Sequence, residues 1–377
     1  MKFLIPTQEF NYLLNKVQNV IPVKPAIPVL ANVLIEASQG MLTLTGSDLT
    51  VAVRCETDVK VFEEGVIALP ARRLVPLVRE LTAPELELVV DDNQTAHIKS
   101  GSSKFKIHGI RGLDYPKMPV MAGAISFKME AELLKELLYS VSFAVAKEDS
   151  RFVLTGVLMR IADGLLTFLG SDGKRLARAQ KSLDVDRALS GSYIIPLKAV
   201  EELLKSLSEQ EEAVISVLPD KIAFQVGKTT LITKLLAGEF PDVSRVIPER
   251  SELTVSLHRE ELTTLLRQVS LFTSEEFHSV KFTFADGELK LSANATDLGE
   301  GKVSMPVNYR GAEFQIAFSP QFFLDALRHS KGEVVTLGLT DPYNPGVLTE
   351  NEGSLSSTHG ASPLFVLMPM RLQNATP

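Results

Sequence analysis

Apolar residues recur with helical spacing at three places along the chain. In each place they occupy positions i, i+3, i+4 and i+7, which puts one apolar stripe along a helix. The three sets are Phe10, Leu13, Leu14 and Val17; Leu134, Leu137, Leu138 and Val141; and Leu262, Leu265, Leu266 and Val269. The pattern predicts three related helices that each bury one face.

A strand–turn–strand pattern follows each of these helices. Apolar residues alternate with polar ones on both sides of a glycine, as in a β-hairpin. The paired segments are 33–36 with 42–45, 157–159 with 166–168, and 280–284 with 289–291. The turn glycines, Gly40, Gly164 and Gly287, are 124 and 123 residues apart. Such a spacing indicates a threefold repeat of domain size.

A second helical stripe also recurs once in each repeat. Its members are Leu74, Leu77, Val78 and Leu81; Val200, Leu203, Leu204 and Leu207; and Phe323, Ala326 and Leu327. Pro70 and Pro196 precede the first two copies, where a missing N–H costs little. Pro76 falls inside the first copy and is expected to kink or delay that helix.

The repeats predict an α+β fold of three similar domains. We place them at residues 1–122, 123–247 and 248–372, each with two helices packed on antiparallel sheet. The repetition does not name a function, because any duplicated scaffold would show it.

Composition restricts the setting in which the chain works. No apolar run approaches the ~20 residues that span a bilayer, and polar Thr7-Gln8-Glu9 follows the first residues, which predicts a cytoplasmic protein. The single cysteine, Cys55, alternates with Val51 and Val53 and is interpreted as a structural thiol. The net charge of −7 argues against a protein coated in nucleic acid, so any DNA binding must be local or topological.

A search for catalytic chemistry finds one candidate motif. Gly227-Lys228-Thr229 resembles part of a phosphate-binding loop, but Ile222 stands where that loop needs a glycine. The alternating segments 222–226 and 230–235 instead predict a hairpin that turns at Gly227.

The other polar residues carry no catalytic or metal-site pattern. The histidines are scattered and are interpreted as surface or turn residues, without the spacing of metal ligands. The pairs Glu201-Glu202, Glu211-Glu212 and Glu275-Glu276 are interpreted as solvated faces. We therefore predict no enzyme activity, no cofactor and no metal.

Several motifs resemble one known family. They include Ala26-Ile27-Pro28-Val29-Leu30, Gly46-Ser47-Asp48-Leu49, Asp172-Gly173-Lys174-Arg175-Leu176, Phe240-Pro241-Asp242 and Met368-Pro369-Met370-Arg371-Leu372. Together they span nearly the whole chain and are specific as a set. The chain resembles the β subunits of bacterial DNA polymerase III, the sliding-clamp family.

The resemblance implies a non-catalytic processivity factor. Members form head-to-tail homodimers whose six domains close into a ring around duplex DNA. The implied partners are the DNA polymerase III alpha subunit, the clamp loader delta subunit and other proteins with clamp-binding motifs. By resemblance, Phe105 and Ile107 pack on Leu271 and Phe272 of a second copy. The alternative interpretation places these four residues in the core of their own domains.

The resemblance also implies weak DNA contacts. The basic residues that match DNA-facing positions are Lys24, Arg151 and Lys198. Phe152 and Val153 stand where the family has tyrosines, and Leu197 where it has arginine. Polar contacts to DNA are therefore expected to be weaker in this chain.

The resemblance further implies a hydrophobic cleft for partner peptides between the second and third domains. Its residues are Leu154, Ser171, Gly173, Lys174, Arg175, Leu176, Pro241, Arg245, Val246, Phe277, Ser319, Phe322, Gly346, Val366, Leu367, Met368, Pro369, Met370 and Arg371. Lys174, Ser319 and Phe322 depart from the commoner His, Asn and Tyr, which puts the peptide preference in question. The tail 373–377 extends past the usual end of the family, and whether it covers the cleft stays open.

Two other classes of function remain on the residues alone. A triphosphate-using enzyme would rest on the Gly227-Lys228-Thr229 motif, which a nucleotide-binding assay tests. A repeat scaffold that binds proteins alone would not be retained on circular DNA.

Overall fold

The computed structural model describes residues 1–183, 189–207, 211–248, 250–274, 278–295, 298–350 and 363–371. The chain divides into two compact units. The first unit combines Met1–Lys135 with Lys198–Leu235, and the second combines Glu136–Leu197 with Leu236–Pro377. The second sequence repeat therefore contributes to both units.

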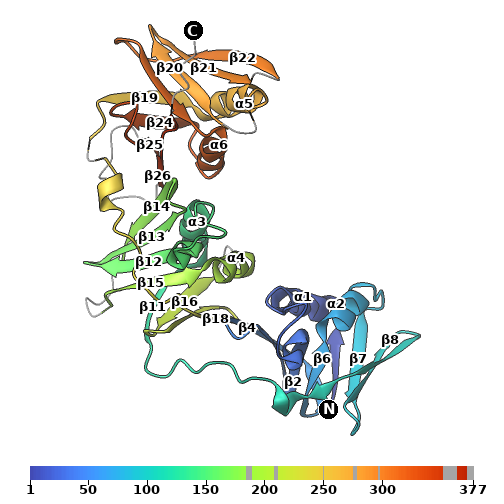
Figure 1. Ribbon diagram of the computed structural model, residues 1–377. Helices are drawn as coiled ribbons and strands as arrows, with labels where there is room; N and C mark the ends of the chain where they lie inside the picture. Colours follow the sequence, from blue (N-terminus) through green and yellow to red (C-terminus); the bar gives the residue numbers. More distant parts are fainter. Residues whose placement is uncertain are drawn as a thin grey trace. The chain divides into compact units, whose positions relative to one another are not determined.

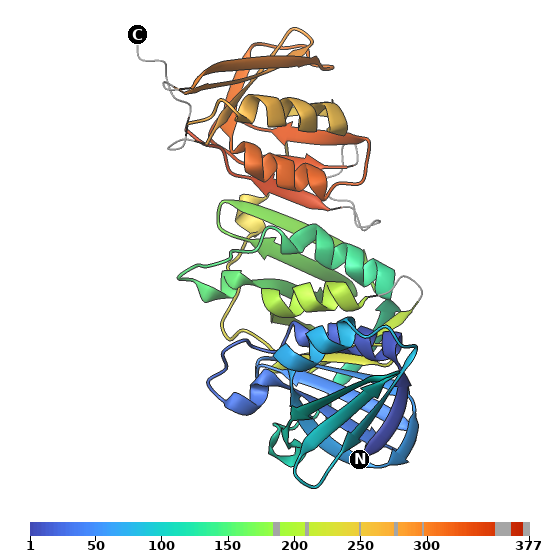
Figure 2. The same cartoon turned by 90° about the vertical axis from the view of Figure 1, so that its right-hand side faces the viewer.

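The structure confirms all six predicted helices. The first helix of each repeat is α1 (Thr7–Gln18), α3 (Ala131–Ser142) or α5 (Arg259–Ser270), and the second is α2 (Ala71–Arg79), α4 (Leu197–Ser206) or α6 (Pro320–Arg328). Helices α1 and α2 pack on each other beside the strands of the first repeat (Figure 1). Helices α5 and α6 do the same in the third repeat (Figure 2).

Helix α2 corrects one expectation about Pro76. The helix begins at Ala71, immediately after Pro70, so the predicted delay is wrong. Pro76 is exposed on this helix. Because water can reach the backbone carbonyl that loses its helical partner there, the helix tolerates the proline.

Each predicted hairpin is present and turns in the same way. The strand pairs are β2 (Asn32–Ser38) with β3 (Met41–Ser47), β12 (Gly156–Ala162) with β13 (Leu165–Ser171), and β20 (Val280–Ala285) with β21 (Glu288–Ala295). Gly40, Gly164 and Gly287 have φ of 77°, 73° and 81°. The residue before each glycine also has a positive φ. Two central residues with positive φ characterise the type I′ turn, which matches the natural twist of a hairpin.

The first unit contains two antiparallel sheets. The five-stranded sheet has the order β5-β1-β7-β8-β9, and the nine-stranded sheet has the order β10-β6-β2-β3-β4-β18-β17-β16-β11. The further strands of this unit are β1 (Lys2–Pro6), β4 (Val51–Asp58), β5 (Lys60–Glu63), β6 (Gly65–Pro70), β7 (Glu85–Val90), β8 (Thr95–Ser100), β9 (Ser103–His108), β10 (Ile110–Arg111), β11 (Ile125–Glu130), β16 (Glu212–Val217), β17 (Lys221–Val226) and β18 (Thr229–Lys234).

The second unit repeats this plan. An eight-stranded sheet has the order β15-β12-β13-β14-β26-β25-β24-β19, and a four-stranded sheet has the order β22-β21-β20-β23. Its further strands are β14 (Arg175–Ser182), β15 (Gly191–Pro196), β19 (Leu253–His258), β22 (Gly299–Pro306), β23 (Phe314–Phe318), β24 (Val334–Leu339), β25 (Gly346–Thr349) and β26 (Leu364–Leu367). Among the described residues, short 3-10 helices lie in connections within each unit, namely η1 (Pro28–Ala31) and η2 (Gly112–Asp114) in the first and η3 (Phe152–Thr155) and η4 (Ser244–Val246) in the second.

The large sheets form because one repeat pairs with the next. Strand β18, the last of the second repeat, pairs with β4 of the first from Thr229↔Cys55 to Thr233↔Val51. Strand β26, the last of the third repeat, pairs with β14 of the second from Arg175↔Leu367 to Arg178↔Leu364. These shared sheets explain why the compact units cut across the second repeat. The domain bounds read from the sequence stay a prediction.

Two interpretations of single motifs are confirmed. Gly227 lies in the turn between β17 and β18, where its φ is 54°, so the lysine beside it belongs to a hairpin. Cys55 is buried, and burial raises the pKa of its thiol to about 12, which keeps it protonated and unreactive.

The interpretation of one acidic pair as a solvated face is wrong in part. Glu202 is buried at 6% exposure on α4, and its carboxylate pairs with Lys205 at 2.7 Å. The i, i+3 spacing on the helix brings the two side chains together. The pair 275–276 lies outside the described residues.

Two glycines mark where the first helix of a repeat meets its hairpin. A Cβ atom at Gly170 would lie 2.3 Å from the backbone oxygen of Val141, and one at Gly46 would lie 2.7 Å from that of Val17. Helix and strand therefore approach each other too closely for any side chain at these positions.

We expect Gly170→Ala to lower the free energy of unfolding by about 1–3 kcal/mol, because a fixed backbone atom occupies the space that the methyl group needs. Chemical denaturation measures the change. Gly191→Ala is the control, since the three atoms nearest to its Cβ belong to the side chain of Tyr193 and not to the backbone. Equal stability of Gly170→Ala and the wild-type protein would contradict the close approach.

Candidate functional site

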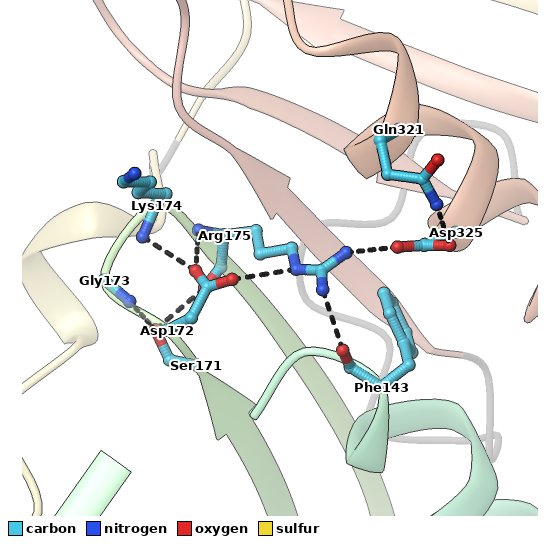
Figure 3. Close-up of polar contacts among 8 residues, drawn as sticks. All are labelled: Phe143, Ser171, Asp172, Gly173, Lys174, Arg175, Gln321 and Asp325. Atoms are coloured by element: carbon cyan, nitrogen blue, oxygen red, sulfur yellow. Dashed lines mark hydrogen bonds and ion pairs between the residues drawn. The ribbon is translucent and has the colours of Figure 1, made fainter. Parts of the chain in front are cut away.

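The turn between β13 and β14 is held by its own side chains (Figure 3). The Asp172 carboxylate accepts hydrogen bonds from the backbone N–H groups of Lys174 at 2.9 Å and Arg175 at 3.0 Å. The Ser171 hydroxyl accepts from Gly173 N–H at 3.1 Å and donates to the backbone oxygen of Arg175 at 2.8 Å. Gly173 has a φ of 82°, a conformation that favours glycine. The turn therefore has a fixed shape.

Arg175 joins this turn to the third repeat. Its Nε donates to Asp172 at 3.0 Å, its Nη1 to Asp325 on α6 at 2.6 Å, and its Nη2 to the backbone oxygen of Phe143 at 2.9 Å. Figure 3 shows the three contacts spread around one guanidinium. The aromatic rings of Phe143 and Phe322 lie 5.3 and 4.6 Å from its central carbon. Arg175 is thus enclosed by charged and aromatic neighbours.

A pocket of about 190 Å³ opens beside this turn. Buried Leu154, Leu176 and Val366 supply its apolar surface, while Val246 and Met368 are each 39% exposed. The remaining lining residues are Arg151, Ser171, Gly173, Arg175, Pro241, Asp242 and Val243. The size and lining suit one or two apolar side chains of a ligand, with charged groups nearby.

The structure brings nine of the predicted cleft residues into this pocket. They are Leu154, Ser171, Gly173, Arg175, Leu176, Pro241, Val246, Val366 and Met368. Two more adjoin it through the backbone, because Lys174 accepts a hydrogen bond from Met368 N–H and Leu367 pairs with both Arg175 and Gly346.

The other predicted cleft residues lie outside the pocket lining. Met370 bridges to Ala317 at the end of β23, close in sequence to Ser319 and Phe322 at the start of α6. Arg245 and Arg371 are exposed, and Pro369 is half-buried. Phe277 lies outside the described residues.

Arg151 lies at the pocket, although the resemblance places it among the DNA-facing residues. It lines the pocket and forms an ion pair with Asp149 at 3.1 Å. A Cβ atom at Gly173 would come within 2.7 Å of its Nη2. The absence of a side chain at Gly173 therefore makes room for this guanidinium.

The other candidate DNA contacts belong to the first unit. Lys198, at the start of α4, pairs with Asp48 at 2.5 Å. Lys24 is exposed in the connection that follows α1. Lys198 is thus already paired with a carboxylate of the protein.

The candidate interface residues are not part of a domain core. Phe105 and Ile107 are half-buried on β9, the edge strand of the five-stranded sheet. Leu271 follows α5 and is 74% exposed, while Phe272 is half-buried with its ring against Gly301 of β22. An exposed leucine and an open strand edge are typical of surfaces that meet another chain.

The sequence did not reveal Asp325, Phe143 or His329 as neighbours of the site. His329 stacks on Phe143 with ring centroids 4.2 Å apart and an interplanar angle of 14°, and Tyr139 lies 4.4 Å away. His329 lies in the turn after α6, which agrees with the expectation of a surface or turn histidine, but two aromatic residues of α3 and its end cover part of its ring. Asp242 and Val243 also line the pocket, and the sequence could have indicated them, since Asp242 ends the Phe240-Pro241-Asp242 motif and Val243 follows it.

Comparison with known families agrees with this geometry. Models of the DNA polymerase III beta subunit match the chain in three parts, with the N-terminal domain at residues 1–119, the central domain at 128–242 and the C-terminal domain at 244–363. The chain belongs to the DNA polymerase III beta subunit family.

Curated relatives and solved structures match the same full length. The chain is 50% identical to the beta sliding clamp of Chlamydia pneumoniae and 30% identical to that of Pseudomonas putida, over 99% of this chain and 100% of each relative. The Pseudomonas aeruginosa sliding clamp bound to griselimycin has a TM-score of 0.93 at 28% identity. That of Bartonella birtlesii, also bound to griselimycin, has 0.92 at 30%. Both solved structures cover 99% of this chain and 100% of their own.

Membership of this family settles the class of function. The protein is a DNA sliding clamp, a processivity factor of DNA replication that does not catalyse a reaction itself. Its fold is the clamp fold of three repeated domains, which assembles as a dimeric ring. Among the described residues, no helix is long and apolar enough to cross a membrane.

The burial of the stacked histidine predicts a pH-dependent contribution to the stability of this sliding clamp. Burial lowers the pKa of His329 below its ordinary value of 6.5, and Asp325, Arg328 and Arg175 are its charged neighbours. Below about pH 6.5, His329 of the unfolded chain takes up a proton, whereas the same side chain in the folded protein stays neutral until the pH is lower. The stabilisation from the neutral ring is therefore complete above about pH 6.5 and decreases as the pH falls further.

We expect His329→Phe to retain the ring stack but lose this part of the pH dependence. Melting temperatures measured from about pH 7.5 to 5.5 should fall less in the variant than in the wild-type protein. Exposed His278→Phe serves as the control and should follow the wild-type curve. Parallel curves for His329→Phe and wild type would show that this histidine does not contribute.

Proposed function

We propose that the pocket beside Arg175 is where partner proteins dock on the clamp. The observation that carries this proposal is the buried apolar surface of Leu154, Leu176 and Val366, which opens to solvent between Val246 and Met368. Methionine adapts to side chains of different shape, which suits a site that receives several partners. Two solved relatives carry the ligand griselimycin, which supports a ligand-accepting site in this family.

The occupants we propose are short linear motifs rich in Gln, Leu and Phe. Their sources would be the DNA polymerase III alpha subunit, the clamp loader delta subunit and other proteins with clamp-binding motifs. The wider cleft would continue from the pocket toward α6, over Lys174, Arg245, Ser319, Phe322, Gly346, Leu367, Pro369, Met370 and Arg371. A micromolar affinity, about −8 kcal/mol, suits partners that exchange.

We propose that the same strand pairing that joins repeats also closes the dimer. Within the chain, the last strand of the second repeat and that of the third each pair with the strand that follows the hairpin of the preceding repeat, as β18 does with β4 and β26 with β14. Two strands without such a partner are β9, the last strand of the five-stranded sheet, and β22, which follows the hairpin of the third repeat, and each lies at the edge of its sheet. Pairing of β9 with β22 of a second copy would use both edges in a head-to-tail contact.

The candidate interface residues fit this closure. Phe105 and Ile107 lie on β9, while Phe272 packs against Gly301 on β22 and Leu271 is exposed beside it. Apolar contacts at both edges would accompany the backbone pairing. Large apolar side chains of this kind dominate the energetics of many interfaces.

We propose that DNA is retained mainly by encirclement. Lys24, Arg151 and Lys198 would add weak phosphate contacts, which the net charge of −7 and the Lys198–Asp48 pair keep modest. We also propose the domain bounds 1–122, 123–247 and 248–372 and a cytoplasmic location, as the sequence indicates.

The docking proposal predicts that Leu176→Ala combined with Met368→Ala weakens binding of a Gln/Leu/Phe-rich peptide by roughly tenfold or more, because both apolar contacts are lost. Calorimetry measures the affinity. Leu49→Ala, at the matching turn of the first repeat, is the control and should leave binding unchanged. Wild-type affinity in the double variant would show that peptides dock elsewhere.

Ring closure predicts that Leu271→Ala combined with Phe272→Ala yields a folded monomer, as sedimentation and circular dichroism would show.

Once loaded on nicked circular DNA, the wild-type ring should remain at high salt and leave after linearisation, since a topological link does not depend on phosphate contacts. The monomer should not be retained at all.

Two further variants make this test specific. Leu271→Lys acts on a side chain that is 74% exposed, so it should break the dimer without affecting the fold. Val334→Ala, an exposed apolar residue on β24, should remain dimeric. A stable dimer of Leu271→Lys would place the interface elsewhere.

A further inference from the structure

Arg175 lines the pocket, and three of the five N–H groups of its guanidinium are already bound within the protein. Each of its three side-chain nitrogens already donates to an acceptor, namely Asp172, Asp325 or the backbone oxygen of Phe143. Its side chain is 13% exposed. The guanidinium therefore forms part of the pocket wall, and its position affects the shape of the pocket.

The three acceptors differ in where they come from. Asp172 lies in the same turn as Arg175, and Phe143 follows α3 of the same repeat. Asp325 lies on α6 of the third repeat and makes the shortest of the three contacts, at 2.6 Å. The position of the guanidinium thus depends on a residue of another repeat.

Asp325 is itself held in place. One carboxylate oxygen accepts from Gln321, one turn earlier on α6, at 2.9 Å, and the other accepts from Arg175. The side chain is 15% exposed, so the pair with Arg175 is largely shielded from water. A shielded charge pair is sensitive to geometry, because a lost partner leaves the remaining charge poorly solvated.

We propose that Asp325 is a positioning residue for the peptide pocket. By fixing Arg175 from the third repeat, it sets the pocket wall and makes peptide affinity depend on the junction between the second and third repeats. This inference rests on the proposed docking function and deepens it. Asp325 does not line the pocket, so it acts on a ligand through Arg175.

The test is a double-mutant cycle on the full-length clamp. Dissociation constants of a fluorescent Gln/Leu/Phe-rich peptide are measured for the wild-type protein, Asp325→Asn, Arg175→Ala and the combined variant. We expect Asp325→Asn to weaken binding roughly tenfold, and the combined variant to bind no more weakly than Arg175→Ala alone. An unchanged dissociation constant in Asp325→Asn, or fold-changes that multiply in the combined variant, would overturn the proposal.

A second ion pair of the same junction provides the matched control. Lys331, which follows α6, pairs with Glu136 on α3 away from the pocket lining. Lys331→Ala should therefore leave the peptide affinity unchanged. A loss equal to that of Asp325→Asn would mean that any weakening of the junction suffices, which contradicts a specific role for Asp325. Asp325→Glu keeps the charge and should bind with intermediate affinity, which guards against a misfolded Asn variant.

A readout without peptide separates this proposal from the docking proposal. The Arg175 Nε–H resonance in an NMR spectrum should be protected from exchange in the wild-type protein and in Lys331→Ala, and should shift or broaden in Asp325→Asn. If the Leu176 and Met368 double variant still binds peptides, the docking proposal fails, whereas the resonance still reports on Asp325. An Arg175 resonance that is identical in Asp325→Asn would overturn the positioning role.

Discussion

Backbone pairing between neighbouring repeats is the interaction on which this structure depends. Strand β18 continues the sheet of the first repeat at β4, and β26 continues that of the second at β14. The second and third repeats thus each add their last strand to a strand of the preceding repeat. In the first repeat β9 remains at the edge of its sheet, and in the third repeat so does β22, the strand that follows the repeated hairpin. Two such chains can satisfy each other, which is why this arrangement favours a closed assembly over a single chain.

Side-chain ion pairs reinforce both junctions, but unequally. Lys198 and Asp48 connect the second repeat to the first with side-chain exposures of 44% and 18%, whereas Arg175 and Asp325 connect it to the third with 13% and 15%. Exposed pairs contribute little to stability, because water and salt screen them. A shielded arginine with several fixed acceptors instead imposes one geometry on its surroundings. The second junction is therefore the more precisely shaped of the two.

The sequence predicted the parts of the structure that depend on local pattern. Helical spacing located all six helices, and the glycines of the three hairpins marked the type I′ turns, because both signals act within a few residues. The cleft residues came from a resemblance, and nine of them share one pocket. The sequence could not predict the burial of Glu202, the stack on His329 or the contact between Arg175 and Asp325. Each of these depends on which side chains the tertiary fold brings together, and Arg175 and Asp325 are 150 residues apart.

One residue distinguishes the turn beside the pocket from the matching turn of the first repeat. Ser47-Asp48-Leu49 and Ser171-Asp172-Gly173 fold alike, with the aspartate accepting backbone N–H groups and the third residue at positive φ, 73° at Leu49 and 82° at Gly173. In the second repeat a Cβ atom at Gly173 would collide with the Arg151 guanidinium. Leucine at this position would thus displace the Arg151 guanidinium. Gly173 avoids both problems, since glycine adopts a positive φ without strain and leaves the space beside Arg151 open. The repeats therefore share one framework for joining domains, and in the second repeat the missing side chain of Gly173 leaves space for Arg151 beside the turn.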